Sequence, residues 1–187
     1  MKFITQFALA GTILLLCGPI LPAASQTAAT AKTQLKDSKG KDVGAADFTQ
    51  TPAGVLIKLS LKGLPAGDHA FHIHTVGKCE PPSFESAGGH FNPGQTHHGM
   101  LAGEGHAGDM PNLHVPANGA LAVEVLNDKI TLDKGKPNSL FDNDGSSLVI
   151  HAKADDYKTD PAGNAGDRLA CGVIGASSST VGGPQPR

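Results

Sequence analysis

The most restrictive feature of the chain is a long segment that has the repeat of neither a strand nor a helix. From Gly77 to Pro111 the sequence is rich in glycine, proline, histidine and acidic residues. A connection of this length is uncommon inside a compact domain unless something fixes it. The segment contains Cys79 and a group of histidines, whose side chains can form a covalent bond or bind metal. Apolar burial cannot order this loop, so the cysteine and the histidines must do so. We therefore expect the functional residues to lie in this loop.

Around this segment the sequence predicts short β-strands. Residues 55–62 read VLIKLSLK, with an apolar residue at every odd position, which is the period-two pattern of a half-buried strand. Further strands are expected at residues 68–75, 119–126, 129–133, 147–153 and 170–175, and a weaker one at 43–49. The chain has 24 glycines, 13 prolines, no tryptophan and 4% aromatic residues. This composition favours short strands with long connections over a helix bundle.

The first 25 residues are expected to be a secretory signal peptide. Lys2 gives a positive start, an apolar run spans residues 7–21, and small residues follow at 23–25. An uncleaved membrane anchor and a lipid-modified Cys17 are the alternatives, and the bulky Leu16 disfavours the second. After cleavage we expect no membrane association and a location in the periplasm.

The remaining chain is expected to form one domain, since 187 residues are too few for two domains of ordinary size. We expect a loose N-terminal segment at 26–41 leading into a first strand, the folded domain at 42–175 and a flexible tail at 176–187. The formal net charge is −2 and there is no run of Lys or Arg, which excludes a basic nucleic-acid surface as the main feature.

Two cysteines remain once the leader is removed, Cys79 and Cys171. An even pair in an exported protein suggests a disulfide, and two buried free thiols are the alternative. The bond would close a loop of about 93 residues, for which loop entropy suggests on the order of 4–5 kcal/mol of stabilisation.

The histidines predict two metal sites. His72 and His74 lie two residues apart on an expected strand, so both imidazoles project from one face, and His151 has the same position on its own strand. With His90 as a fourth ligand, this all-imidazole set suits Cu(II). A second set lies wholly in the loop and consists of His90, His98, His106 and Asp109. Three nitrogens and a carboxylate suit tetrahedral zinc.

Four motifs in order along the chain resemble the copper–zinc superoxide dismutases, and the resemblance runs from about Val43 to Gly175. The motifs are His72-x-His74, Gly89-His90-Phe91-Asn92-Pro93, His106-Ala107-Gly108-Asp109 and the stretch from Gly163 to Gly175, GNAGDRLACGVIG. The segment from Cys79 to His90 and the FDNDG stretch at 141–145 resemble the bacterial periplasmic branch. The resemblance implies an all-β fold, a Greek-key β-sandwich or flattened barrel of about eight antiparallel strands with long metal-binding loops.

The resemblance also implies roles for individual residues. His72, His74, His90 and His151 would bind copper, and His90, His98, His106 and Asp109 would bind zinc, so that His90 is shared. Family spacing from His90 selects His98 rather than His97 for the zinc. Asp155 would link His72 to His98, and Cys79 would pair with Cys171. Arg168 would lie at the mouth of the copper channel. Its alternative role is purely structural, as a hydrogen-bond donor that orders the loop.

Four other positions complete the comparison with the family pattern. His69 matches a histidine that packs and donates hydrogen bonds, and we interpret His97 and His114 as surface residues. Ala70 stands where the family usually has glycine, which would be costly if that position needs a positive φ.

The implied reaction is the disproportionation of superoxide to oxygen and hydrogen peroxide by a copper redox cycle, with structural zinc. His90 would carry a proton to the second superoxide, and Arg168 would attract the anion. The alternative function is a non-catalytic periplasmic copper-binding or storage module. A copper-only dismutase and a structural adhesion-type sandwich fit the histidine sets less well. The protein is expected to be a monomer or a homodimer.

Overall fold

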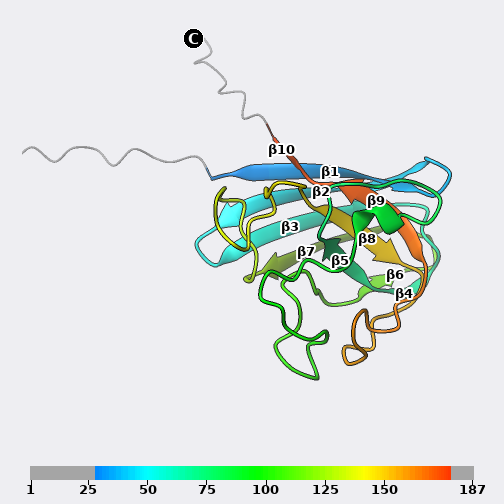
Figure 1. The fold of residues 1–187 in the computed structure, drawn as a ribbon. Helices are drawn as coiled ribbons and strands as arrows, with labels where there is room; N and C mark the ends of the chain where they lie inside the picture. The colour runs from blue at the N-terminus through cyan, green and yellow to red at the C-terminus, as the bar shows by residue number, and fades with distance from the viewer. Residues whose placement is uncertain (1–27, 178–187) are drawn as a thin grey trace, which may run out of the picture.

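The computed structural model describes residues 28–177 and is built almost entirely of β-strands (Figure 1). The elements are β1 (Thr30–Asp37), β2 (Asp42–Thr51), β3 (Gly54–Leu61), β4 (Gly67–His69), β5 (Phe71–His74), the 3₁₀ turn η1 (Glu85–Ala87), β6 (Leu113–Val115), β7 (Leu121–Asn127), β8 (Ser147–His151), β9 (Arg168–Val173) and β10 (Gly175–Ala176). Every pair of these strands that is hydrogen-bonded runs antiparallel.

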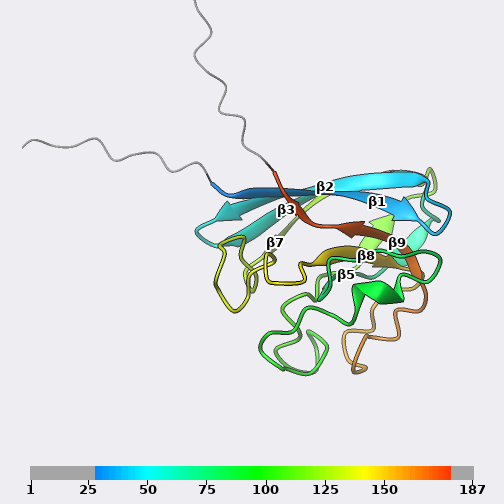
Figure 2. The ribbon, with the colours of Figure 1, turned by 45° about the horizontal axis from the view of Figure 1, so that its top comes forward.

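The main sheet has the order β5-β8-β9-β1-β2-β3-β7, with β10 paired to β1, while β4 and β6 form a separate pair. The chain crosses from β3, near one end of this order, to β5 at the other end, and crosses again between β7 and β8. These crossovers are typical of Greek-key topology. The sheet curls on itself (Figures 1 and 2), so the expected all-β sandwich or flattened barrel is confirmed.

The core fills the inside of the curled sheet. On β3 the odd positions Val55 to Leu61 are buried and Lys58 and Ser60 are exposed, as the period-two pattern predicts. Burying one such aliphatic side chain contributes about 1.5–3 kcal/mol. Phe71, Ile73, Leu148 and Ile150 join the same cluster from β5 and β8. The alternate residues of β5 and β8 therefore face away from the core, and those residues include the histidines.

Two long loops lie together beside β5 and β8. Figures 1 and 2 both show the segment after β5 next to the segment between β8 and β9. The backbone N–H of Leu101 in the first loop donates to the carbonyl of Tyr157 in the second, at 3.1 Å. The disulfide between Cys79 and Cys171 ties the start of the first loop to β9, and the two residues are 92 apart in sequence.

The prediction of a loose segment at 26–41 is wrong for residues 30–37, because they form β1 in the middle of the sheet. Along β1, Ala31, Thr33 and Leu35 are buried while the residues between them are exposed. The alternation was hidden because two of the three buried residues, Ala31 and Thr33, carry little apolar surface. Ala176, expected to begin the tail, pairs with Ala31.

The strand expected at 129–133 is also wrong. Ile130 and Leu132 are buried, but the segment makes only an isolated bridge between Thr131 and Ser139. The side chain of Gln50 accepts hydrogen bonds from the Thr131 hydroxyl and from the Leu132 N–H, at 2.9 and 2.7 Å. A side chain therefore satisfies the backbone that a neighbouring strand would otherwise pair with.

Three smaller differences remain. The strand expected at 68–75 is two strands, β4 and β5, interrupted at Ala70. β6 and η1 were not expected. The signal peptide at 1–25 and all but the first residues of the expected tail lie outside the described residues. Within residues 28–177 no helix has the length and hydropathy needed to cross a membrane.

Candidate metal centre

Strands β5 and β8 place three imidazoles on the face of the sheet opposite the core. His72, His74 and His151 are all buried. His90 comes from the long loop, which is fixed to β5 by a backbone bridge between His90 and His74. One ring nitrogen from each of these four histidines lies within 4.8 Å of the others. Two neighbouring strands thus hold three of the four histidines in place, and the long loop supplies the fourth.

Hydrogen bonds determine which nitrogens of this first group are free. His74 Nδ1 faces the Gly88 carbonyl at 2.9 Å, and His151 Nδ1 faces the Gly166 carbonyl at 3.3 Å. Carbonyl oxygens only accept, so each Nδ1 carries the proton and each Nε2 presents a lone pair. The two Nε2 atoms are 3.4 Å apart. Facing lone pairs repel, and a cation between them removes that repulsion.

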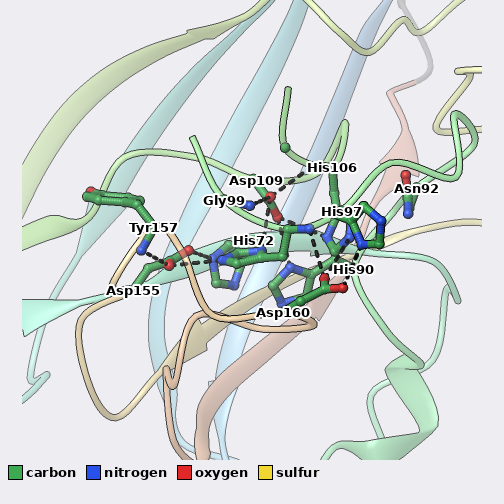
Figure 3. A network of polar contacts seen from close by, with 12 residues as sticks. His72, His90, Asn92, His97, Gly99, His106, Asp109, Asp155, Tyr157 and Asp160 are labelled. Carbon is green, nitrogen blue, oxygen red and sulfur yellow. Dashed lines mark hydrogen bonds and ion pairs between the residues drawn. The ribbon is translucent and has the colours of Figure 1, made fainter. Parts of the chain in front are cut away.

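The second group consists of His90, His98, His106 and Asp109, whose ligand atoms again lie within 4.8 Å of one another. Asp109 Oδ1 is 2.8 Å from His90 Nδ1, and Asp109 Oδ2 is 3.0 Å from His98 Nδ1. The backbone N–H of His106 donates to Asp109 Oδ2 at 2.9 Å. The carboxylate is thereby oriented toward the three rings, and Figure 3 shows Asp109 with His90 and His106.

Asp155 joins the two groups. Its Oδ2 accepts from His72 Nε2 at 2.8 Å, and its Oδ1 accepts from His98 Nε2 at 3.0 Å. Each histidine therefore keeps its proton on Nε2 and turns Nδ1 toward its own group. A carboxylate in this position orients two ligands at once.

Burial keeps three imidazoles of the first group neutral, those of His72, His74 and His151. It lowers the pKa of His72 to about 4 and that of His151 to about 3, and it holds the pKa of His74 well below its ordinary value. Burial alone would raise the pKa of Asp155, but hydrogen bonds from His72, His98 and the Tyr157 N–H outweigh it and lower that pKa to about 2. The pKa of Asp109 is also lowered, because hydrogen bonds from His90 and the His106 backbone outweigh burial.

Unpaired buried nitrogens show that the residues fit metal ions. His72 Nδ1, His90 Nε2, His98 Nδ1 and His106 Nδ1 are all buried without a hydrogen-bond partner. A buried polar atom without a partner costs free energy, and four such nitrogens in two adjacent groups call for a shared explanation. Neutral imidazoles with inward lone pairs and an ionised carboxylate supply the ligand types that copper and zinc bind.

A family model described as copper/zinc superoxide dismutase matches residues 43–174. The chain belongs to this family. It is 57% identical over 140 residues to "Superoxide dismutase [Cu-Zn] 1" of Aquifex aeolicus, which covers 74% of this chain and 83% of the relative.

Solved structures of the family have the same fold. Cu/Zn superoxide dismutase from Brucella abortus gives a TM-score of 0.64 at 31% identity, covering 77% of this chain and 98% of that one. A superoxide dismutase-like protein from Bacillus subtilis gives a TM-score of 0.73 at 42% identity, covering 76% and 96%. The copper/zinc superoxide dismutase family uses both metals, and the two histidine groups agree with that pair of cofactors.

Arg168 lies beside the first group. Its Nη1 donates to the Phe84 carbonyl at 2.6 Å and its Nη2 to the Gly88 carbonyl at 2.8 Å. The same Gly88 oxygen is the acceptor for His74 Nδ1. Burial lowers the pKa of Arg168 from its ordinary value, and the guanidinium stays charged because an arginine does not deprotonate in proteins. Arg168 therefore ties two carbonyls of the long loop together, and its charge lies next to the first group.

The remaining histidines of the chain lie outside both groups. The His97 side chain is 93% exposed and pairs with Asp160, whereas His98 is fully buried in the second group. His114 is exposed and pairs with Asp68. His69 is buried, and its ring nitrogens face the carbonyls of His151 and Pro65.

Ala70 needs no unusual backbone conformation, since it is absent from the positive-φ residues of the described chain. The N–H of Ala70 donates to the carbonyl of Lys153, and the carbonyl of Ala70 accepts from the N–H of His151. Alanine therefore extends the pairing of β5 with β8 by one residue. The cost considered for this substitution therefore does not arise.

Sequence reasoning missed the residues that support the groups. Gly88 and Gly166 act through carbonyl oxygens, which every residue type carries, so no sequence signal marks them. Asp160 accepts the His98 backbone N–H at 2.8 Å. Tyr157 and Asn112 hold Asp155 by hydrogen bonds. The one available signal was that Tyr157 is the only tyrosine of the chain.

Proposed function

We propose that His72, His74, His90 and His151 bind copper, that His90, His98, His106 and Asp109 bind zinc, and that His90 bridges the two ions. The observation that carries this proposal is the position of His90 in both groups. Its Nδ1 faces Asp109, and its Nε2 is buried without a partner. One ring can therefore offer one nitrogen to each ion.

The reaction converts two superoxide anions and two protons into oxygen and hydrogen peroxide. Bound copper supplies one-electron oxidation and reduction, and zinc is redox-inert. The chain supplies rigid neutral ligands and a proton carrier. His90 Nε2 would hold a proton for the second superoxide. The contact between His90 Nδ1 and Asp109 would keep the ring in place. His72, His74 and His151 lie on strands or at a strand end and stay oriented throughout.

Arg168 would attract the substrate. Superoxide is an anion, and the formal charge of the whole chain is −2, or about −3 once Lys2 is removed with the leader. A net negative surface slows the approach of an anion, so a local positive charge near the first group is needed. The guanidinium beside Gly88 and His74 has that position.

We also propose that the mature protein acts in the periplasm. The support is the apolar leader with small residues at 23–25 and the disulfide between Cys79 and Cys171, which is a bond that persists in oxidising compartments. Fractionation of cells that express the full chain should give a processed, disulfide-bonded protein in the periplasmic fraction. An unprocessed chain in the cytoplasm would contradict this location.

Stopped-flow measurement of superoxide decay tests the proposed function. The mature protein loaded with one copper and one zinc should give fast second-order decay, and the metal-free protein should not. Full loading with decay no faster than in buffer would reject the catalytic proposal and favour non-catalytic copper binding. The protein from Bacillus subtilis that is called superoxide dismutase-like makes this control worthwhile.

A further inference from the structure

A closed ring of hydrogen bonds surrounds the carboxylate that links the two histidine groups. The side chain of Asn112 pairs with the backbone of Asp155 in both directions: Asp155 N–H donates to Asn112 Oδ1 at 2.8 Å, and Asn112 Nδ2 donates to the Asp155 carbonyl at 2.9 Å. The backbone N–H of Asn112 in turn donates to the phenol oxygen of Tyr157 at 2.6 Å. The Tyr157 N–H donates to Asp155 Oδ1, also at 2.6 Å. Tyr157 thus contacts Asp155 directly and also through Asn112.

Tyr157 also supports the loop that carries His98. Its carbonyl accepts the N–H of Leu101 at 3.1 Å. Gly99 passes so close above this carbonyl that a Cβ at Gly99 would overlap its oxygen. Tyr157 has a positive φ of 60°, a conformation that residues other than glycine rarely adopt, and so the surrounding contacts must hold it there. Figure 3 shows Asp155 between Tyr157 and the ring of His72.

We propose that Tyr157 is a positioning residue for both metal groups, which acts by holding Asp155 between His72 and His98. The proposal rests on the proposed roles of these histidines as metal ligands. The phenol oxygen fixes Asn112, and Asn112 fixes the backbone of Asp155. The Tyr157 N–H fixes the carboxylate itself. His98 Nε2 and His72 Nε2 then have a stationary acceptor, and their Nδ1 atoms stay directed into the two groups.

The test is the zinc affinity of the copper-loaded protein, measured by competition with a chelator. Tyr157→Phe removes only the phenol oxygen and leaves the Asn112 N–H without its acceptor. Loss of a group that orients a metal ligand typically weakens metal binding by about 10–100-fold, and we expect the lower end of this range because Tyr157 acts through Asp155.

A control variant from the same loop is Thr159→Val. Thr159 donates to Asp156 at 2.6 Å and accepts from Asn164 at 3.1 Å, but it makes no hydrogen bond to Asp155. This change removes loop-ordering hydrogen bonds without touching the ring around Asp155. Its zinc affinity should stay within about twofold of wild type, by the near-independence of sites that share no partner.

A double-mutant cycle separates positioning from general stability. If Tyr157 acts through Asp155, then Tyr157→Phe should weaken zinc binding in the wild-type background and have no further effect in the Asp155→Asn background. The Cu(II) electron paramagnetic resonance spectrum of Tyr157→Phe should also shift toward that of Asp155→Asn, because His72 loses the same fixed acceptor. Thr159→Val should keep the wild-type spectrum.

Two results would overturn the assignment of Tyr157. One is a zinc affinity of Tyr157→Phe equal to that of wild type, and the other is the same loss of affinity in both backgrounds, which a merely structural role would produce. A wild-type protein that binds copper but no zinc would instead reject the proposed function, and the positioning role with it.

Discussion

Acid should destabilise the metal-free protein steeply, because His72, His74 and His151 are buried in their neutral form. The pKa of His72 is lowered to about 4 and that of His151 to about 3, and the pKa of His74 is also well below its ordinary value. In the unfolded chain each would have a pKa of about 6.5. Between these limits the unfolded state binds more protons than the folded state, so the free energy of unfolding falls as the pH falls.

The size of this effect follows from the number of protons that the unfolded state binds and the folded state does not, which are called excluded protons below. Each contributes about 1.4 kcal/mol per pH unit, so three histidines give about 4 kcal/mol per unit once the unfolded histidines are protonated, between about pH 5.5 and pH 4.5. Asp109 and Asp155 contribute little there, because unfolded carboxyl groups take up protons mainly below about pH 4, and the stabilisation is lost between that pH and the lowered folded-state pKa values. A typical domain has about 5–15 kcal/mol in total, so the loss is large.

Urea unfolding of the metal-free, disulfide-intact protein at several pH values measures this slope. His151→Asn should reduce it by about 1.4 kcal/mol per pH unit, since one excluded proton is removed. His114→Asn is the control, because the His114 side chain is 81% exposed. A slope below about 1.4 kcal/mol per unit in wild type would mean that fewer than one proton is excluded, and it would refute the reasoning.

Three further predictions concern the metals and the substrate. His151→Ala should lose copper and largely retain zinc, since His151 belongs to the first group alone, and equal loss of both metals in metal analysis would argue against separate sites. Arg168→Ile should slow superoxide decay and flatten its dependence on ionic strength, and an unchanged salt profile in stopped flow would remove Arg168 from the steering role. Gly163→Ala should weaken zinc binding by about 10–100-fold, because a Cβ there would overlap the Asp155 carboxylate, whereas Gly103→Ala, with open space around it, should match wild type in the same chelator titration.

The sequence predicted the part of the site that depends on strand periodicity. His72 and His74 share a face because strand residues two apart always do, and His151 follows the same rule on β8. The strand at 55–62 was predicted for the same reason and corresponds to β3. The family pattern then singled out His98, and the structure places its ring in the second group and that of His97 in solvent.

What the sequence could not predict depends on tertiary contacts. The burial of Ile130 and Leu132 produces the alternation of a strand, yet Gln50, about eighty residues away, supplies the hydrogen bonds instead. β1 was missed because Thr33 and Ala31 carry a weak apolar signal, although they alternate with two lysines and a glutamine. The support of Asp155 was missed because Tyr157 and Asn112 lie in loops, where no periodicity marks a contact.

The most direct test of the central claim is a crystal structure of the copper- and zinc-loaded protein with anomalous diffraction recorded at the absorption edges of both metals. The claim predicts a copper peak among His72, His74, His90 and His151, a zinc peak among His90, His98, His106 and Asp109, and His90 in contact with both. Both metals in one group, or a copper peak and a zinc peak without His90 between them, would contradict it.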